Sequence, residues 1–306
     1  MKLKQQIYRI HVVGCSPRSG TTLMTEILYN CFEIDMYNGF ESNISVCPPH
    51  SGNIFLTKSP KDIVIVKDIL NAMKNLYVIY LVRDPRDVIV SKHPWDKDRY
   101  WSSLKFWKLF TPFGRALRDH RRFITVRYED LVQNPGYVNE LIKERMPFLQ
   151  SKAPFSNFHK IANPSAHSLD ALGGLRPISE GSIGNWRNHK ERVLGQILKH
   201  GPISEDLIEY GYETDNSWER ELTGIQPDLK VSHPSAFDSQ AFITKKLRWN
   251  KLRALRMYIG HSTLLLKLKS LFTVKNHTPA PFGTTGNNTM DSLVYSGERV
   301  TAKTSG

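Results

Sequence analysis

The chain has 306 residues, and its 42 Lys and Arg against 29 Asp and Glu give a formal net charge of +13. This positive charge indicates an anionic ligand; nucleic acid, an anionic membrane and a phosphorylated nucleotide all fit it. The hydrophobic content of 40% is enough for one large α/β domain, with or without appendages. Three cysteines without a CxxC pair argue against a disulfide framework or a zinc site, and indicate a reducing compartment.

The hydrophobic pattern contains no run long enough to span a membrane. The apolar stretch at residues 7–14 is also too short for the core of a signal peptide. We therefore expect an unsecreted, cytoplasmic protein.

Strands and helices alternate along the first half of the chain. A strand rich in β-branched residues at 7–13 ends in Gly14, and a helix with apolar residues at helical spacing follows at 21–32. Residues 76–82 (LYVIYLV) are continuously apolar, as in a parallel strand that is covered on both faces. The other elements that we expect are strands at 54–57 and 123–126 and helices at 61–73, 85–92 and 128–132. This alternation predicts an α/β fold, a P-loop-like three-layer sandwich with a central parallel sheet and flanking helices.

The second half of the chain has a weaker pattern. Residues 147–188 are expected to form a long loop region that faces the ligand, followed by helices near 191–199 and 204–210. From about residue 215 onward no core is expected, and the last thirty residues have the composition of a disordered chain. The predicted organisation is therefore a folded domain over 1–214, a basic C-terminal extension over 215–275 and a disordered tail over 276–306.

The segment that lies between the first strand and the first helix is glycine-rich and carries one cation. Such a loop, together with the N-terminus of a helix, forms a concave group of backbone amides that binds anionic oxygens. Hydroxyl groups add hydrogen-bond donors, and a guanidinium adds a planar charge. The residues predicted to bind the ligand here are Pro17, Arg18, Ser19, Gly20, Thr21 and Thr22.

This loop differs from the P-loop of a phosphate-transferring enzyme, GxxxxGK[ST]. The residue after Gly20 is Thr21 and not Lys, and the cation is inside the loop at Arg18. No acidic residue that would hold Mg²⁺ follows the apolar strand, because Val82 leads into Arg83. A transferring sulfuryl group carries less negative charge than a γ-phosphoryl group, so cations and amides can suffice to stabilise it without a metal ion. We therefore expect no metal site. A P-loop kinase or NTPase remains an alternative.

Four segments, in this order, resemble motifs of the sulfotransferases that use 3′-phosphoadenosine 5′-phosphosulfate (PAPS). SPRSGTTL resembles their 5′-phosphosulfate loop, and YLVRDPRDVIVSKH resembles their 3′-phosphate motif, with Arg83 and Ser91 at the matching spacing. VRYEDLVQNP is similar to the segment that places a Tyr near the adenine, here Tyr128. GSIGNWRNH resembles their late GxxGxWK segment, with Gly184 and Trp186 kept and Arg187 in the Lys position.

The resemblance implies a reaction and a set of roles. A sulfuryl group would move from PAPS to the hydroxyl of a glycan, a phenol or tyrosine, or another small molecule, and adenosine 3′,5′-bisphosphate would be released. Arg18, Lys58 and the loop amides would stabilise charge on the transferring group, and Arg83 and Ser91 would bind the 3′-phosphate. Lys58 occupies the matching position in Thr57-Lys58-Ser59-Pro60.

Some positions depart from the cytosolic small-molecule branch of this family. The His that usually follows the matched Lys is absent, and the chain looks more similar to the tyrosylprotein and bacterial carbohydrate-type branches, which makes Glu41 the candidate general base. His50 and His93 are rivals for that role. Ser179-Glu180 replaces the usual Arg-Lys pair, so Arg176 or Arg187 would have to substitute.

Other residues are expected to be structural. Trp101, Phe106, Trp107 and Phe110 have near-helical spacing and are expected to pack in the core, and Arg86 and Asp87 are expected to form a solvent-exposed pair at a helix start. The basic segment 245–275 could contact an anionic membrane or pack on the domain as a solvated helix, and we favour packing. No specific nucleic-acid site is expected, although a non-catalytic binder of nucleotides or polyanions remains a second alternative.

Overall fold

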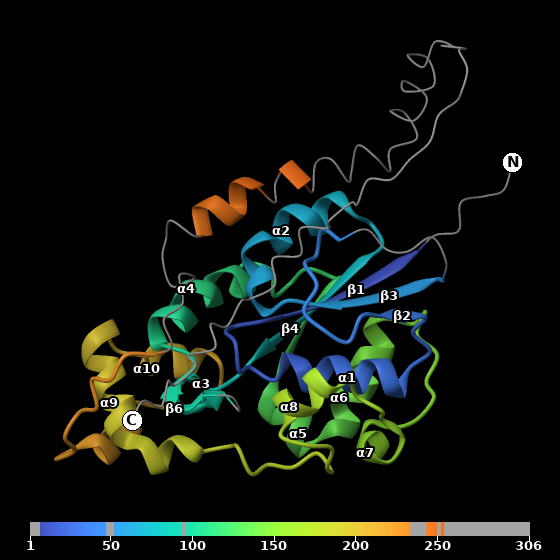
Figure 1. The fold of residues 1–306 in the computed structure, drawn as a ribbon. Coiled ribbons are helices and arrows are strands. Elements are labelled where there is room, and N and C mark those ends of the chain that lie inside the picture. Colours follow the sequence, from blue (N-terminus) through green and yellow to red (C-terminus); the bar gives the residue numbers. More distant parts are fainter. Residues whose placement is uncertain (1–6, 47–51, 94–95, 233–242, 250–251, 254–306) are drawn as a thin grey trace, which may run out of the picture. The chain divides into compact units, whose positions relative to one another are not determined.

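The structure is a computed structural model that describes residues 7–46, 52–93, 96–232, 243–249 and 252–253. A five-stranded, fully parallel sheet forms the centre, in the order β2-β3-β1-β4-β7 (Figure 1). Its strands are β1 (Tyr8–Gly14), β2 (Met36–Tyr37), β3 (Ile54–Lys58), β4 (Leu76–Val82) and β7 (Phe123–Arg127). A separate antiparallel pair consists of β5 (Lys92–His93) and β6 (Asp96–Tyr100).

The helices cover both faces of the sheet. In Figure 1, α2 and α4 lie on one face, and α1, α5, α6, α7 and α8 lie on the other. The helices of the first half are α1 (Thr21–Cys31), α2 (Ile63–Ala72), α3 (Pro85–Val90) and α4 (Leu104–Arg115), with the 3₁₀ turn η1 (Pro60–Asp62) before α2. Those that follow are α5 (Tyr128–Gln133), α6 (Pro135–Arg145), η2 (Phe155–Asn157), α7 (Phe158–Ile161), α8 (Ala166–Leu172), η3 (Asn185–His189), α9 (Lys190–His200), α10 (Ser204–Glu209) and η4 (Ser217–Leu222).

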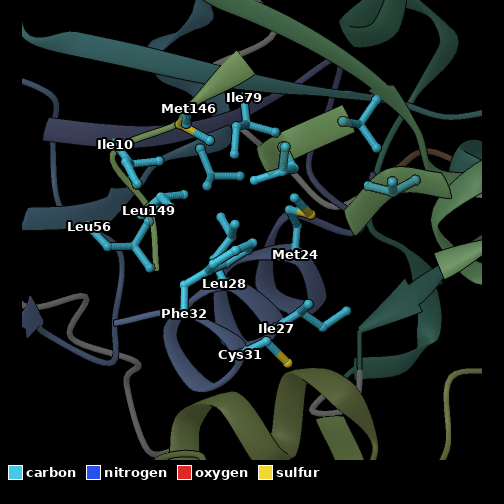
Figure 2. Packing of buried hydrophobic residues seen from close by; sticks show 14 of the residues in the cluster. Ile10, Met24, Ile27, Leu28, Cys31, Phe32, Leu56, Ile79, Met146 and Leu149 are labelled. Atoms are coloured by element: carbon cyan, nitrogen blue, oxygen red, sulfur yellow. The ribbon is translucent and has the colours of Figure 1, made fainter. Parts of the chain in front are cut away.

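The two faces of the sheet have separate apolar cores, because successive side chains of a strand point to opposite faces. On β1, Ile10 and Val12 join one core with Met24 and Leu28 of α1, whereas Val13 joins the other core, with α2 and α4 (Figure 2 shows the α1 side). A sheet that is buried on both faces explains why β4 is apolar at every position. The predicted three-layer α/β sandwich is therefore confirmed.

Local sequence signals explain several element boundaries. Asp84 caps α3 by accepting a hydrogen bond from the Arg86 amide, and Pro85 occupies the first helical turn. Ser103 caps α4 in the same way. Pro135 follows the end of α5, as predicted, but it also begins α6, because a proline at the first helical position loses no intrahelical hydrogen bond.

The expectation that no core exists after residue 215 is wrong. Trp218 is only 4% exposed, and it packs with Trp186 and Val193 in a third apolar cluster around α9 and α10. Ile243 is 1% exposed and joins the core between α2 and α4. These residues lie far from the sheet motifs in sequence, so their partners are supplied only by the tertiary fold.

The expected placement of Arg86 and Asp87 in solvent is also wrong, since both side chains are buried. Arg86 pairs with Asp84 and Glu213, at 2.7 and 2.6 Å. The core role expected for Phe106, Trp107 and Phe110 is confirmed. No described helix is long and apolar enough to cross a membrane. The predicted domain limits at 214 and 275 stay predictions.

Candidate functional site

Four of the candidate ligand-binding segments follow the carboxyl ends of parallel strands. The glycine-rich loop follows β1, Lys58 ends β3, Arg83 follows β4 and Tyr128 follows β7. Because parallel strands end at the same edge of a sheet, the fold gathers these four segments at one place. The chain also changes direction across the sheet between β1 and β4, which is where open α/β sheets bind their ligands.

The loop between β1 and α1 has a backbone that few residues can adopt. Arg18 has a φ of 72°, which makes it the non-glycine residue with a positive φ among those described. Gly20 has a φ of 93°, and a Cβ atom there would lie 2.4 Å from the ring of Tyr128. The loop is therefore held in a strained conformation against Tyr128, and such strain is typical of binding sites.

The start of α1 and the end of β3 meet at this loop. The Nζ atom of Lys58 donates a hydrogen bond to Oγ1 of Thr22 at 3.2 Å, and the Lys58 side chain is 4% exposed. The amides in the first turn of α1 have no intrahelical acceptor, and Gly20 provides no side-chain cap. These donors and the Lys58 ammonium thus form one continuous positive surface.

Arg18 and Arg83 are linked in the same region. Nε of Arg18 donates to Oγ of Ser91 at 3.0 Å, and Nη1 of Arg83 donates to the Arg18 carbonyl at 3.0 Å. The Arg83 guanidinium also lies 4.3 Å from the ring centroid of Tyr128. Burial, together with the nearby charge of Arg83, lowers the pKa of Arg18 to about 10. Both effects disfavour the charged form of Arg18.

These residues line a pocket of about 240 Å³. Its polar part contains Arg18, Arg83, Ser91 and Arg176, and its apolar part is lined by Leu23, Phe158, Leu172 and Ile178. Of the described residues that line it, Asp87 is the acidic one. No carboxylate in the described part of the chain forms an ion pair with any of the three arginines.

Asp87 fastens the late segment across this pocket. Its carboxylate accepts hydrogen bonds from the amides of Gly184 at 2.8 Å and Trp186 at 2.9 Å. Ser182 in the same segment offers its carbonyl to Arg83 at 2.8 Å and its hydroxyl to Tyr128 at 2.7 Å. Burial is the main reason why the pKa of Asp87 is raised.

Three residues of the GSIGNWRNH segment, Gly184, Trp186 and Arg187, were predicted to bind the cofactor, but they do not line this pocket. Trp186 is buried beside Arg86, whose guanidinium carbon is 4.3 Å from the ring centroid. Arg187 is half-exposed and pairs with Glu221 at 3.3 Å. Gly184, Trp186 and Arg187 line a second cavity, of about 200 Å³, together with Asp87. The structure thus brings Arg18, Gly20, Thr21, Thr22, Arg83, Ser91 and Tyr128 to the first pocket. The residues that line it do not include these three, nor the predicted site residues Pro17, Ser19, Lys58 and Glu41.

The candidate base lies beside the candidate catalytic lysine. A carboxylate oxygen of Glu41 is 3.6 Å from Nζ of Lys58, and the Glu41 side chain is 53% exposed. Of its rivals, His50 is outside the described residues, and only the backbone of His93 is described, in β5.

Sequence reasoning missed the residues of α8 and of the turn after it. Leu172 and Ile178 form part of the apolar wall, and Ser168 anchors α8 by donating to the buried carboxylate of Glu26 at 2.6 Å. Tyr37 donates to the same carboxylate at 3.1 Å. The short apolar spacing within 166–172 was the available signal, but the glycines and prolines around it favoured a loop.

A search with family models matches residues 30–143 to the sulfotransferase family. The matched segment contains Lys58, Arg83, Ser91 and Tyr128, which the structure gathers at one edge of the sheet. Over this segment the chain is similar to the sulfotransferase family.

A human relative, sulfotransferase 2A1, is 26% identical over an alignment of 147 residues that covers 37% of this chain and 50% of the relative. The chain thus spans about half the length of that curated sulfotransferase. The predicted closeness to the tyrosylprotein and bacterial carbohydrate-type branches stays a prediction.

Two sulfotransferase domains of known structure are also similar to this chain. The domain from the Synechococcus PCC 7002 olefin synthase is 16% identical to this chain, with a TM-score of 0.36. The aligned region covers 61% of this chain and 90% of that domain. The domain from the curacin biosynthetic pathway is 14% identical to this chain, with a TM-score of 0.37. The aligned region covers 80% of this chain and 99% of that domain.

Proposed function

We propose that this protein is a sulfotransferase that transfers a sulfuryl group from PAPS to the hydroxyl of an acceptor, and releases adenosine 3′,5′-bisphosphate. The observation that carries the proposal is the group of three arginines, Arg18, Arg83 and Arg176, that line one pocket without a carboxylate partner. Arg83 is buried, Arg18 is half-buried and Arg176 is exposed. Cations that are removed from water are costly unless an anion compensates them, so Arg18 and Arg83 in particular favour a ligand with several negative charges.

The residues present fit such a nucleotide in further respects. Nε of Arg83, a residue that lines this pocket, is buried without a hydrogen-bond partner, so it is available to a ligand oxygen. Leu23, Leu172 and Ile178 provide an apolar wall next to Tyr128, which suits a purine ring. Bound PAPS supplies an activated sulfuryl group.

Arg176 and Arg187 are the two candidates for one role in the proposed site, binding of the 3′-phosphate. The usual Arg-Lys pair is replaced by Ser179-Glu180, and only Arg176 of the two candidate substitutes lines the pocket. Arg176 donates to the Gly173 carbonyl at 2.9 Å, whereas Arg187 pairs with Glu221. We therefore assign Arg176, with Arg83 and Ser91, to the 3′-phosphate.

The chemical step is proposed to use the residues at the ends of β1 and β3. Lys58, Thr22 and the amides of the first turn of α1 stabilise negative charge on the transferring group and the leaving phosphate. Glu41 takes the proton of the acceptor hydroxyl, and its exposed carboxylate is accessible to an acceptor from solvent. The acceptor is a glycan, a phenol or tyrosine, or another small molecule.

The direct test is transfer of ³⁵S from labelled PAPS to an acceptor in a mixed extract, with EDTA and with Mg²⁺. We expect transfer in both conditions. Calorimetry should show binding of adenosine 3′,5′-bisphosphate that is stronger than binding of Mg-ATP. Preference for Mg-ATP would instead indicate a kinase or NTPase, and binding without transfer would indicate a non-catalytic nucleotide binder.

A role for Glu41 as base can be tested within the same assay. Glu41→Gln should lower kcat and remove the rise of activity with pH, because the amide cannot accept the proton. Full kcat with an unchanged pH profile would assign the base elsewhere.

The cytoplasmic location and the contact of segment 245–275 with an anionic membrane also remain proposals. Only 245–249 and 252–253 of that segment are described. Co-sedimentation with anionic liposomes, with and without residues 254–306, tests the membrane contact. Binding that is lost on truncation would support it.

A further inference from the structure

Part of the C-terminal extension docks on the sheet domain. Residues 243–249 are helical, and Ile243 and Leu247 pack with the apolar core that contains α2 (Figure 1, the orange helix near α2). From the same turn, Nζ of Lys246 lies 2.7 Å from Oδ1 of Asp62, whose side chain is completely buried. The extension thus supplies a cation to a buried carboxylate near the end of β3.

Asp62 is ionised in this environment. Burial alone raises its pKa, but the hydrogen bond with His11 and the positive charge of Lys246 hold that pKa well below its usual range. Nε2 of His11 lies 3.4 Å from Oδ2 of Asp62. Lys246 is therefore part of the compensation that an ionised, buried Asp62 requires.

The same carboxylate holds the segment that follows Glu41. Oδ2 of Asp62 accepts from the Ile44 amide at 2.7 Å, and Oδ1 accepts from the Asn43 side chain at 3.1 Å. Immediately before, the Ser42 amide donates to the Lys58 carbonyl at 2.9 Å. Residues 42–44 are thus fastened between the end of β3 and Asp62, and Glu41 is the next residue.

We propose that Lys246 is a positioning residue for the pair Glu41 and Lys58, which acts through Asp62 and residues 42–44. This inference rests on the proposed function for its catalytic consequence. Without the Lys246 charge, Asp62 keeps His11 but loses its nearest cation, and its hold on Asn43 and Ile44 weakens. The carboxylate of Glu41 then samples a wider range of positions relative to Lys58, while the pocket arginines keep their contacts.

The main test uses three variants of the full chain. Lys246→Gln removes the cation, Lys246→Arg retains it, and Lys245→Gln removes an exposed neighbouring charge as a matched control. Hydrogen exchange of the backbone amides at 42–46 measures how firmly residues 42–44 are held, and it requires no cofactor. Exchange there should rise in Lys246→Gln, and stay at the wild-type level in the other two variants.

The kinetic measurements distinguish a positioning role of Lys246 from a general loss of structure. Lys246→Gln should lower kcat about tenfold, as expected when catalytic groups are misplaced, while affinity for adenosine 3′,5′-bisphosphate changes less than about twofold. Lys246→Arg should restore most of the lost kcat. If Lys246→Gln is poorly folded, Asn43→Ala, which removes a contact of the same carboxylate, should give the same loss of kcat.

Distinct outcomes overturn distinct claims. Unchanged exchange at 42–46 in a folded Lys246→Gln protein contradicts the positioning role, and so does an equal loss of kcat and nucleotide affinity. If the wild-type chain transfers no sulfuryl group but exchange rises as expected, the proposed function fails and the link from Lys246 to residues 42–44 stands.

Discussion

Two groups of buried charges in this molecule differ in how they are compensated. Around Asp62, Lys246 and His11 lie against one carboxylate, and hydrogen bonds from Asn43 and Ile44 reach both of its oxygens. In the pocket, Arg18 and Arg83 contact a hydroxyl and carbonyls, and no described carboxylate pairs with them. The first group is complete within the protein, and the second is not.

The difference indicates what each group is for. A buried charge cluster that is satisfied internally stabilises the fold and becomes costly when one member is removed. A cluster of cations that lacks anions leaves interaction energy for a ligand, and so marks a binding site. Substitutions in the pocket should therefore change binding and catalysis, and substitutions around Asp62 should change stability and local order.

The largest effect is expected for Arg18. Arg18→Ala should lower kcat with PAPS on the order of 10²-fold, because it removes a preorganised donor to developing charge. Its free energy of unfolding should stay near the wild-type value, since an uncompensated cation is removed while Ala must still adopt the φ of 72° at this position. Kinetics and urea denaturation of the same preparation check both expectations. Near-normal turnover by Arg18→Ala would contradict the conclusion that the pocket cations serve a ligand.

A smaller effect distinguishes Arg176 from Arg187. Arg176→Gln should weaken binding of adenosine 3′,5′-bisphosphate about tenfold, as expected for a lost charge-assisted hydrogen bond, with little change for adenosine 5′-monophosphate. Calorimetry with both nucleotides measures this. Arg118→Gln, at an exposed arginine that pairs with Glu209, controls for the change in net charge. A loss of affinity in Arg187→Gln and not in Arg176→Gln would reverse the assignment.

The smallest effect concerns the pH dependence of stability at the Asp62 cluster. Burial is the main reason why the pKa of His11 is lowered, with Asp62 opposing and Arg9 and Lys246 adding to the decrease. The unfolded chain therefore binds a proton near pH 6.5 before the folded chain does. Stability should fall as the pH drops below about 6.5, by at most about 1.4 kcal/mol per pH unit for this one group.

Urea denaturation at pH 7.5 and pH 5.5 tests this in wild type and His11→Asn. The variant should be less stable at both pH values but should lose less on acidification. His120 and His200, whose pKa values are also lowered by burial, contribute equally to both proteins. An identical loss in the two proteins would show that His11 does not titrate in this range.

Much of the sheet and of the pocket was predictable from local sequence. The limits of β4 match residues 76–82, and the glycine-rich loop, Arg83 and Tyr128 lie where the motif order placed them. The reason is that apolar strands, turn glycines and caps act on neighbours in sequence, and parallel strands must end at one edge. The family match over 30–143 agrees with that part of the interpretation.

Only the tertiary structure decided which charges have partners. The sequence could not show that Arg86 is enclosed by Asp84, Glu213 and Trp186, or that Lys246 reaches Asp62. Nor could it show that Arg176 lines the pocket while Arg187 turns to Glu221. Burial and charge pairing depend on contacts between segments far apart in the chain, and no local pattern encodes which distant side chain completes a given site.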